Sequence, residues 1–214
     1  MKKYLLPILL LFLSNLLSNS ESKSKNEIDL WTVIERKLTI DYANDFSSQN
    51  VEKFISYFAP NRKINLYQYG KDVTGENNNG KTIKLYNGNI ISSFIRLRIP
   101  AKIMAKTLFN RLKKQSYKES KIELLGILIE DNSVTAYIRF DRINNSEDIY
   151  QSARGVYRLI NINNDWYITE MRTYDDDDSV DTLIGYDKMM KPKADWYKII
   201  IIRIKYFLMI HKIH

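Results

Sequence analysis

The sequence contains no cysteine, and its only histidines are His211 and His214, at the end of the chain. Without an imidazole in the body of the chain, Ser-His-Asp and Cys-His nucleophile systems and a His–Asp base pair are excluded. Motifs of His and Cys at metal-binding spacing are absent as well, so we predict no metal and no cofactor. The missing cysteine also excludes a lipid-modified N-terminus.

A basic excess over the body of the chain is also lacking. The net charge is +8, but Lys2 and Lys3 lie at the N-terminus and residues 188–214 hold seven Lys or Arg and one Asp. Residues 21–187 contain 24 basic and 24 acidic residues, a net charge of zero. Nucleic-acid-binding domains carry a basic stripe on the folded domain. We therefore predict no nucleic-acid partner.

The N-terminus has the pattern of a secretory signal. Lys2 and Lys3 precede an apolar run from Leu5 to Leu13, and Ser18-Asn19-Ser20 supplies small residues before Glu21. The run is short for a bilayer span of about 20 residues, although an uncleaved anchor is the alternative. We predict a signal peptide at residues 1–20 and a flexible leader at 21–28. The protein is then exported to the periplasm, the cell surface or the medium.

Two helices are predicted at the start of the following domain, residues 29–187. After Asp29, a plausible N-cap, apolar side chains recur at spacings of three and four. Asn50 is expected to cap a second, short helix that ends at Pro60. Further along the chain, Asn89 is expected to open a helical region that ends near Gln115 and that Pro100 splits. The stripe of the first helix comprises Trp31, Ile34, Leu38, Tyr42 and Phe46.

Strand patterns occupy the rest of this domain. Residues 62–70 and 82–88 show the two-residue alternation that is typical of strands, and together they predict a hairpin with a long tip. Four runs rich in Ile, Val, Tyr and Thr follow, and their short polar connections predict an antiparallel meander. Gly126 and Gly155 lie inside runs, where a bulge or bend is the usual reason. The four runs are residues 121–131, 133–143, 148–162 and 165–175.

This order resembles the nuclear transport factor 2-like superfamily, which includes SnoaL-like and ketosteroid isomerase-like proteins. The segment IDYANDFSSQNVEKFISYFAPN looks like the first two helices of that superfamily, and GVYRLININNDWYITEMRTY looks like its last two strands. The resemblance implies an α+β fold in which a curved mixed or antiparallel sheet forms a cone around a long N-terminal helix. It also implies a pocket inside the cone, which some members use for catalysis and others for binding or assembly.

Four residues are candidates for lining this pocket. Tyr42 belongs to the apolar stripe, Tyr67 to the first strand and Tyr157 to a later strand, while Arg139 shares one strand face with Asp141. A buried tyrosine beside a carboxylic acid can polarise a carbonyl, but the sequence places no carboxylate there. The alternatives are that these tyrosines only pack, and that the Arg139 face meets solvent or a partner sheet.

Residues 188–214 form a basic, apolar and aromatic tail outside the cone. Its composition fits an amphipathic helix on an anionic membrane surface, with residues 196–213 as the contact. A further packed helix or strand and a segment that is not native coding sequence are the other interpretations.

The function predicted from these patterns is that of an exported, non-catalytic domain. It would bind a small apolar ligand or a protein partner through the cone. A lyase or isomerase that uses tyrosine and a carboxylate is one alternative. The other is an assembly module that forms a homodimer through the sheet.

Overall fold

The computed structural model describes residues 29–71 and 81–176. The predicted signal peptide, the leader and the basic tail lie outside the described residues, so their predicted roles stay predictions. No helix within the described ranges combines the length and apolarity that a membrane span requires.

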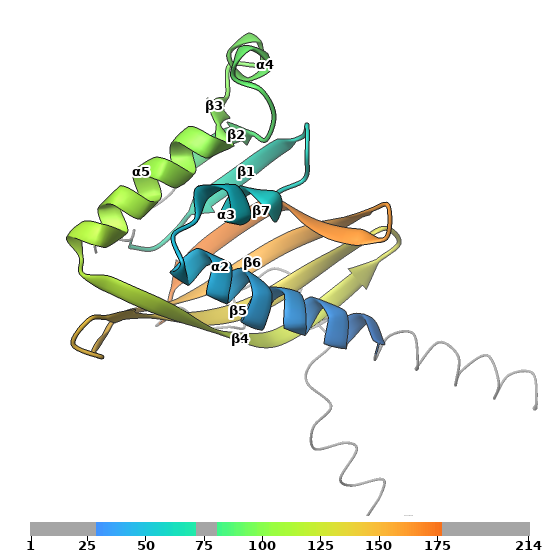
Figure 1. The fold of residues 1–214 in the computed structure, drawn as a ribbon. Helices are drawn as coiled ribbons and strands as arrows, with labels where there is room; N and C mark the ends of the chain where they lie inside the picture. The colour runs from blue at the N-terminus through green and yellow to red at the C-terminus, as the bar shows by residue number, and fades with distance from the viewer. Residues whose placement is uncertain (1–28, 72–80, 177–214) are drawn as a thin grey trace, which may run out of the picture.

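The described chain begins with helices and ends with four long strands (Figure 1). The first helix has an α-helical part at residues 29–35, a π-helical part η2 (Arg36–Tyr42) and a final α-helical part α2 (Ala43–Ser47). The remaining elements, in chain order, are α3 (Val51–Ser56), β1 (Lys63–Gln68), β2 (Lys81–Tyr86), α4 (Ile90–Ile95), β3 (Ile99–Pro100), α5 (Ala101–Lys114), β4 (Tyr117–Glu130), β5 (Ser133–Asn144), β6 (Ile149–Ile162) and β7 (Asp165–Asp175).

All seven strands belong to one mixed sheet in the order β3-β2-β1-β7-β6-β5-β4. The hairpin β1–β2 and the meander β4–β7 are antiparallel, as predicted, whereas β1 pairs with β7 in parallel and β2 with β3 in parallel. Figure 1 shows the sheet curving around the first helix, with α5 beside β2. The α+β cone predicted from the resemblance to the nuclear transport factor 2-like superfamily is confirmed by this arrangement.

The apolar stripe of the first helix forms the centre of the core. Ile34, Leu38, Tyr42 and Phe46 are all buried against the sheet. In an α-helix a row spaced by four residues drifts around the axis by about 40° per step, so this row would leave the core. The π-helical part holds more residues per turn and turns the row back toward the sheet.

Side-chain caps fix where the short helices begin. The side-chain oxygen of Asn50 accepts a hydrogen bond from Lys53 N at 3.1 Å, and that of Asn89 accepts one from Ser92 N at 2.7 Å. Each bond satisfies a backbone donor of the first turn that has no partner in the helix. Asn50 is confirmed as an N-cap, Asn89 caps the helical region that it was predicted to open, and Pro100 lies between α4 and α5. Asp29, the predicted N-cap of the first helix, already has helical conformation.

The two strand glycines have different roles. A register shift lies between Leu124 and Gly126, so the predicted bulge occurs there. No register shift lies at Gly155. A Cβ added there would lie 2.9 Å from Cε1 of Tyr157 and 3.0 Å from Cγ1 of Ile138. Gly155 therefore leaves space for the Tyr157 ring, which follows two residues later on the same face of β6.

The helix α4 stands outside the core, in contrast to the apolar face expected for the whole helical region. Ser93 is its only buried residue, and Leu97, just after it, is 91% exposed. The helical conformation is interrupted between Ile95 and Ala101, where Leu97 has a positive φ of 50°, so the apolar side chains of α4 do not continue the buried face of α5. Ile91, Phe94 and Ile95 are exposed for this reason.

Candidate functional site

A cavity of about 470 Å³ lies inside the cone. Its walls come from α2, α5 and the strands β1, β2, β3, β5, β6 and β7. Its apolar wall consists of Phe46, Leu66, Ile83, Ile99, Ile103, Met104, Leu108, Phe140 and Met171. This volume falls in the range of about 300–1,000 Å³ that small-molecule sites occupy.

Two of the four predicted pocket residues line this cavity. Tyr157 reaches it from β6. Tyr67 borders it from β1, but its ring stacks on Tyr69 at a centroid distance of 6.5 Å and packs against the guanidinium of Arg172, on the outer face of the sheet. Tyr42 is buried and does not line the cavity, but its ring packs edge-on against Tyr157 at a centroid distance of 6.1 Å. Tyr42 thus packs against a cavity residue without lining the cavity itself.

Arg139 lies on the other face of the sheet, so its prediction as a pocket residue needs correction. Along β5 the side chains alternate, and Phe140 and Arg142 point into the cavity. Arg139 and Asp141 therefore point outward, where Arg139 forms ion pairs with Asp141 at 3.6 Å and Asp176 at 3.3 Å. Three residues of separation on a strand always place two side chains on opposite faces.

Burial keeps the phenols of Tyr42 and Tyr157 in their neutral form. Burial raises the pKa of Tyr157 to about 12, although hydrogen bonding with Tyr42 and the charge of Arg142 oppose the shift. Burial, together with the neighbouring Tyr157, also raises the pKa of Tyr42 well above its ordinary value. Neither tyrosine is thus an anion or a general base near neutral pH.

The raised pKa of Tyr157 predicts a loss of stability in alkali. Its contribution is complete below the ordinary tyrosine pKa of about 10 and is lost as the pH rises toward 12, because the phenol of the unfolded chain then ionises while the buried phenol of the folded state keeps its proton. Urea unfolding between pH 8 and pH 12 measures this loss. The decline is expected to be shallower in Tyr157→Phe, which has no ionisable group, and unchanged in Tyr69→Phe, whose ring is 41% exposed. Equal slopes in all three proteins would contradict the prediction.

Arg142 is the cavity residue that the sequence reasoning missed. It lines the cavity from β5 and stands opposite Gln151 of β6. Its Nη1 donates a hydrogen bond to Oε1 of Gln151, and its Cζ lies 4.8 Å from the centre of the Phe140 ring. Desolvation lowers the pKa of its guanidinium, although four nearby tyrosines oppose the shift. The sequence did contain an indication of this position. Arg142 lies two and four residues after the buried Phe140 and Ile138 on the same strand, so it shares their face of the sheet.

The charged side chains among the described lining residues all carry the same sign. Lys71, Lys81 and Arg111 are exposed and join Arg142 among the lining residues. The described lining residues include no Asp or Glu. The remaining polar groups of the wall are neutral and come from Gln68, Thr107 and Thr173, besides the two tyrosines.

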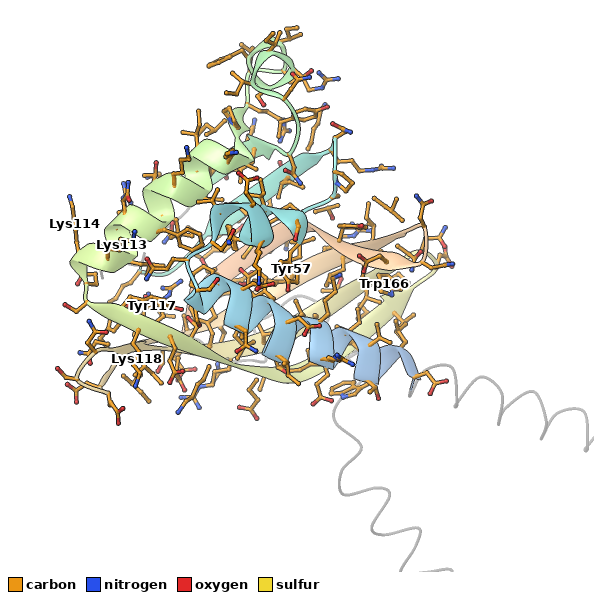
Figure 2. All side chains as sticks on the ribbon, in the orientation of Figure 1. Tyr57, Lys113, Lys114, Tyr117, Lys118 and Trp166 are labelled. Carbon is orange, nitrogen blue, oxygen red and sulfur yellow. The ribbon has the colours of Figure 1, made fainter. Side chains whose placement is uncertain are left out.

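A second, polar hollow lies on the outside of the cone beside the first helix. Figure 2 shows Tyr57 between α3 and the first helix, and its hydroxyl donates to Oδ2 of Asp45 at 2.9 Å. Partial burial and the hydrogen bond to Asp45 raise the pKa of Tyr57. Lys37 bonds Asp165 at 2.6 Å in the same hollow, which Asp41 also lines.

This Tyr57–Asp45 pair is the tyrosine–carboxylate arrangement that the isomerase alternative requires, but it lies outside the cavity. Partial burial opposes ionisation of Asp45, yet hydrogen bonds from Lys53 and Tyr57 hold its pKa below the ordinary value. Asp45 is thus a stable carboxylate with little capacity as a base. Nowhere in residues 29–71 and 81–176 do three His, Cys, Asp or Glu side chains come together as a metal site.

Several solved structures are similar to the described chain. A nuclear transport factor 2-like protein with a cystatin-like fold from Novosphingobium aromaticivorans is 11% identical, with coverage of 75% of this chain and 92% of that one and a TM-score of 0.49. A protein of unknown function from Mycobacterium tuberculosis is 12% identical, with coverage of 72% and 75% and a TM-score of 0.48. A nuclear transport factor 2-like protein of unknown function from Shewanella oneidensis is 14% identical, with coverage of 70% and 99% and a TM-score of 0.44.

The sequence matches no family model and no curated protein. The solved structures are distant at these identities and TM-scores. The assignment of the fold therefore rests on the strand order, the curvature of the sheet and the buried first helix.

Proposed function

We propose that this chain, with its nuclear transport factor 2-like fold, is an exported domain that binds a small apolar ligand in the cone without catalysing a reaction on it. The observation that carries the proposal is the cavity of about 470 Å³ with its continuous apolar wall. Export is part of the proposal through the signal pattern of residues 1–20.

The chemistry of the wall favours binding over turnover. An isomerase or lyase of this type needs a carboxylate within hydrogen-bond reach of the substrate, directly or through one water. The described lining residues offer four cations and the phenol of Tyr157, which has a pKa of about 12. A tyrosine beside a guanidinium can hold a ligand, but it has no partner here to remove a proton from carbon.

The neutral fluorescent probe N-phenyl-1-naphthylamine tests the proposal directly. The purified chain is expected to bind it saturably with one site per chain. Leu108→Trp introduces a larger side chain from α5 into the cavity and is expected to weaken binding at least about tenfold, because the ligand and the indole compete for the same volume. Fluorescence titration measures both affinities.

Lys106→Trp is the matched control, because it places the same indole at an exposed position of the same helix. Its affinity for the probe should equal that of the unmodified chain. Native mass spectrometry of the purified chain provides a second measurement and should show a small molecule that the protein retains. The absence of saturable probe binding by the unmodified chain would overturn the proposal.

A further inference from the structure

The polar contacts of Arg142 leave most of its donors unused. A guanidinium carries five N–H groups. Within residues 29–71 and 81–176 Arg142 makes one hydrogen bond, from Nη1 to Oε1 of Gln151. Its Nε is buried and has no hydrogen-bond partner. Buried polar groups are normally satisfied, so an orphaned donor on a cavity wall indicates a missing partner.

No anion within the described residues neutralises this cation. Its largest electrostatic interactions with other side chains are with four tyrosines. Burial raises the pKa of every one of them above the ordinary value, so all four are neutral at physiological pH. They are Tyr42, Tyr117, Tyr150 and Tyr157.

Arg139 provides an internal comparison on the same strand. Its side chain is 40% exposed, and it nevertheless has two carboxylate partners, Asp141 and Asp176. Arg142 is more deeply placed, where an unpaired charge is more costly, and it has none. Nε of Arg139 is also buried without a hydrogen-bond partner, so the feature that distinguishes Arg142 is its lack of a carboxylate partner among the described residues.

A second orphaned group lies near the first. The hydroxyl oxygen of Tyr150 is buried and has no hydrogen-bond partner. Tyr150 interacts electrostatically with Arg142. It is also the extra residue of a bulge, because Arg142 pairs with Gln151 and Ile143 pairs with Ile149. A bulge turns a side chain away from its regular face, which explains how Tyr150 comes to lie near Arg142.

The chemistry of the missing partner follows from these groups. A guanidinium matches a carboxylate through two parallel N–H···O bonds, and the pair is stronger than a neutral hydrogen bond. The remaining wall is apolar and suits a hydrocarbon body. Lys71, Lys81 and Arg111 lie exposed at the cavity, where they would attract an anion before it enters.

We infer that the ligand of the cavity is an apolar molecule with a terminal carboxylate, whose head group lies against Arg142. This inference rests on the proposed binding function and names the chemical class of its ligand.

Calorimetric titration with dodecanoate and dodecan-1-ol tests the inference, because the two ligands share a chain and differ in the head group. The unmodified chain is expected to bind dodecanoate about 10- to 100-fold more tightly, the size of a charge-assisted hydrogen-bonded pair. In Arg142→Met this preference should disappear, while N-phenyl-1-naphthylamine still binds. In Arg142→Lys, which keeps the charge without the planar fork, the preference should be intermediate.

Arg139→Met is the matched control, because it removes the same charge from the outer face of the same strand. It should leave the preference for dodecanoate unchanged. Equal affinities for the two ligands in the unmodified chain would overturn the inference, even where Arg142→Met does not fold. A preference retained in folded Arg142→Met would also overturn it and assign the head group to Lys71, Lys81 or Arg111. If N-phenyl-1-naphthylamine and both ligands all fail to bind, the proposed function itself is wrong.

Discussion

Replacing Phe54 by alanine is expected to lower the free energy of unfolding by about 3–5 kcal/mol. Phe54 is 2% exposed and contacts four other rings, with centroid distances of 5.8 Å to Tyr42, 5.4 Å to Phe46, 5.1 Å to Phe58 and 5.4 Å to Phe109. These rings come from the first helix, the segment that follows α3, and α5, so the cavity left behind cannot collapse without moving a helix. Urea unfolding measures the loss, and the melting temperature should fall by about 2–4 °C for each kcal/mol.

Phe94→Ala is the control for this prediction, because it deletes the same ring at a position that is 64% exposed. Its free energy of unfolding should stay within about 0.5 kcal/mol of that of the unmodified chain, as for most surface substitutions. If the two variants were destabilised equally, the core described here would be incorrect. Both rings belong to short helices of six residues, so the comparison isolates burial.

The second large effect is expected at Gly155. Valine there should destabilise the fold by about 2–3 kcal/mol, because its Cβ would lie 2.9 Å from the Tyr157 ring and 3.0 Å from the Ile138 side chain. Both neighbours are buried and cannot move away freely. Because Tyr157 lines the cavity, the displaced ring should also weaken binding of N-phenyl-1-naphthylamine. Urea unfolding and the probe titration measure the two effects.

A double-mutant cycle tests the assigned cause. Gly155→Ala is expected to lower the free energy of unfolding less in the Tyr157→Leu background than in the unmodified chain, because the smaller leucine side chain removes the closest contact. Purely additive costs would show that the space at Gly155 is needed for another reason, such as backbone conformation. The same result would remove the link between Gly155 and the cavity.

The local features of the fold were readable from the sequence. The row Ile34, Leu38, Tyr42 and Phe46 predicted which side of the first helix is buried, and Asn50 predicted where the next helix begins. These predictions succeed because periodicity and capping depend on residues only a few positions apart. The π-helical part was not predicted, since it arises where the row must follow a curved sheet.

The cavity was only partly predictable. Tyr67 and Tyr157 were identified as lining residues. Arg139 was named as a pocket candidate with a position facing solvent or a partner sheet as the alternative, and it lies on the outer face, while Arg142 was overlooked. The alternation along β5 does separate Arg139 from Arg142, but alternation alone does not tell which set faces inward. The buried Ile138 and Phe140 decide that question in the folded protein.

By itself the sequence determined the element order, the apolar faces, the helix caps, and the absence of imidazole and thiol chemistry from the domain. Only the tertiary structure decided that β1 pairs with β7, and this pairing joins segments about a hundred residues apart to close the wall of the cavity. It alone also showed that a cation inside the cone lacks an anionic partner among the described residues. Local periodicity follows from the geometry of a single helix or strand, whereas the position of a charge among its neighbours depends on how distant segments pack.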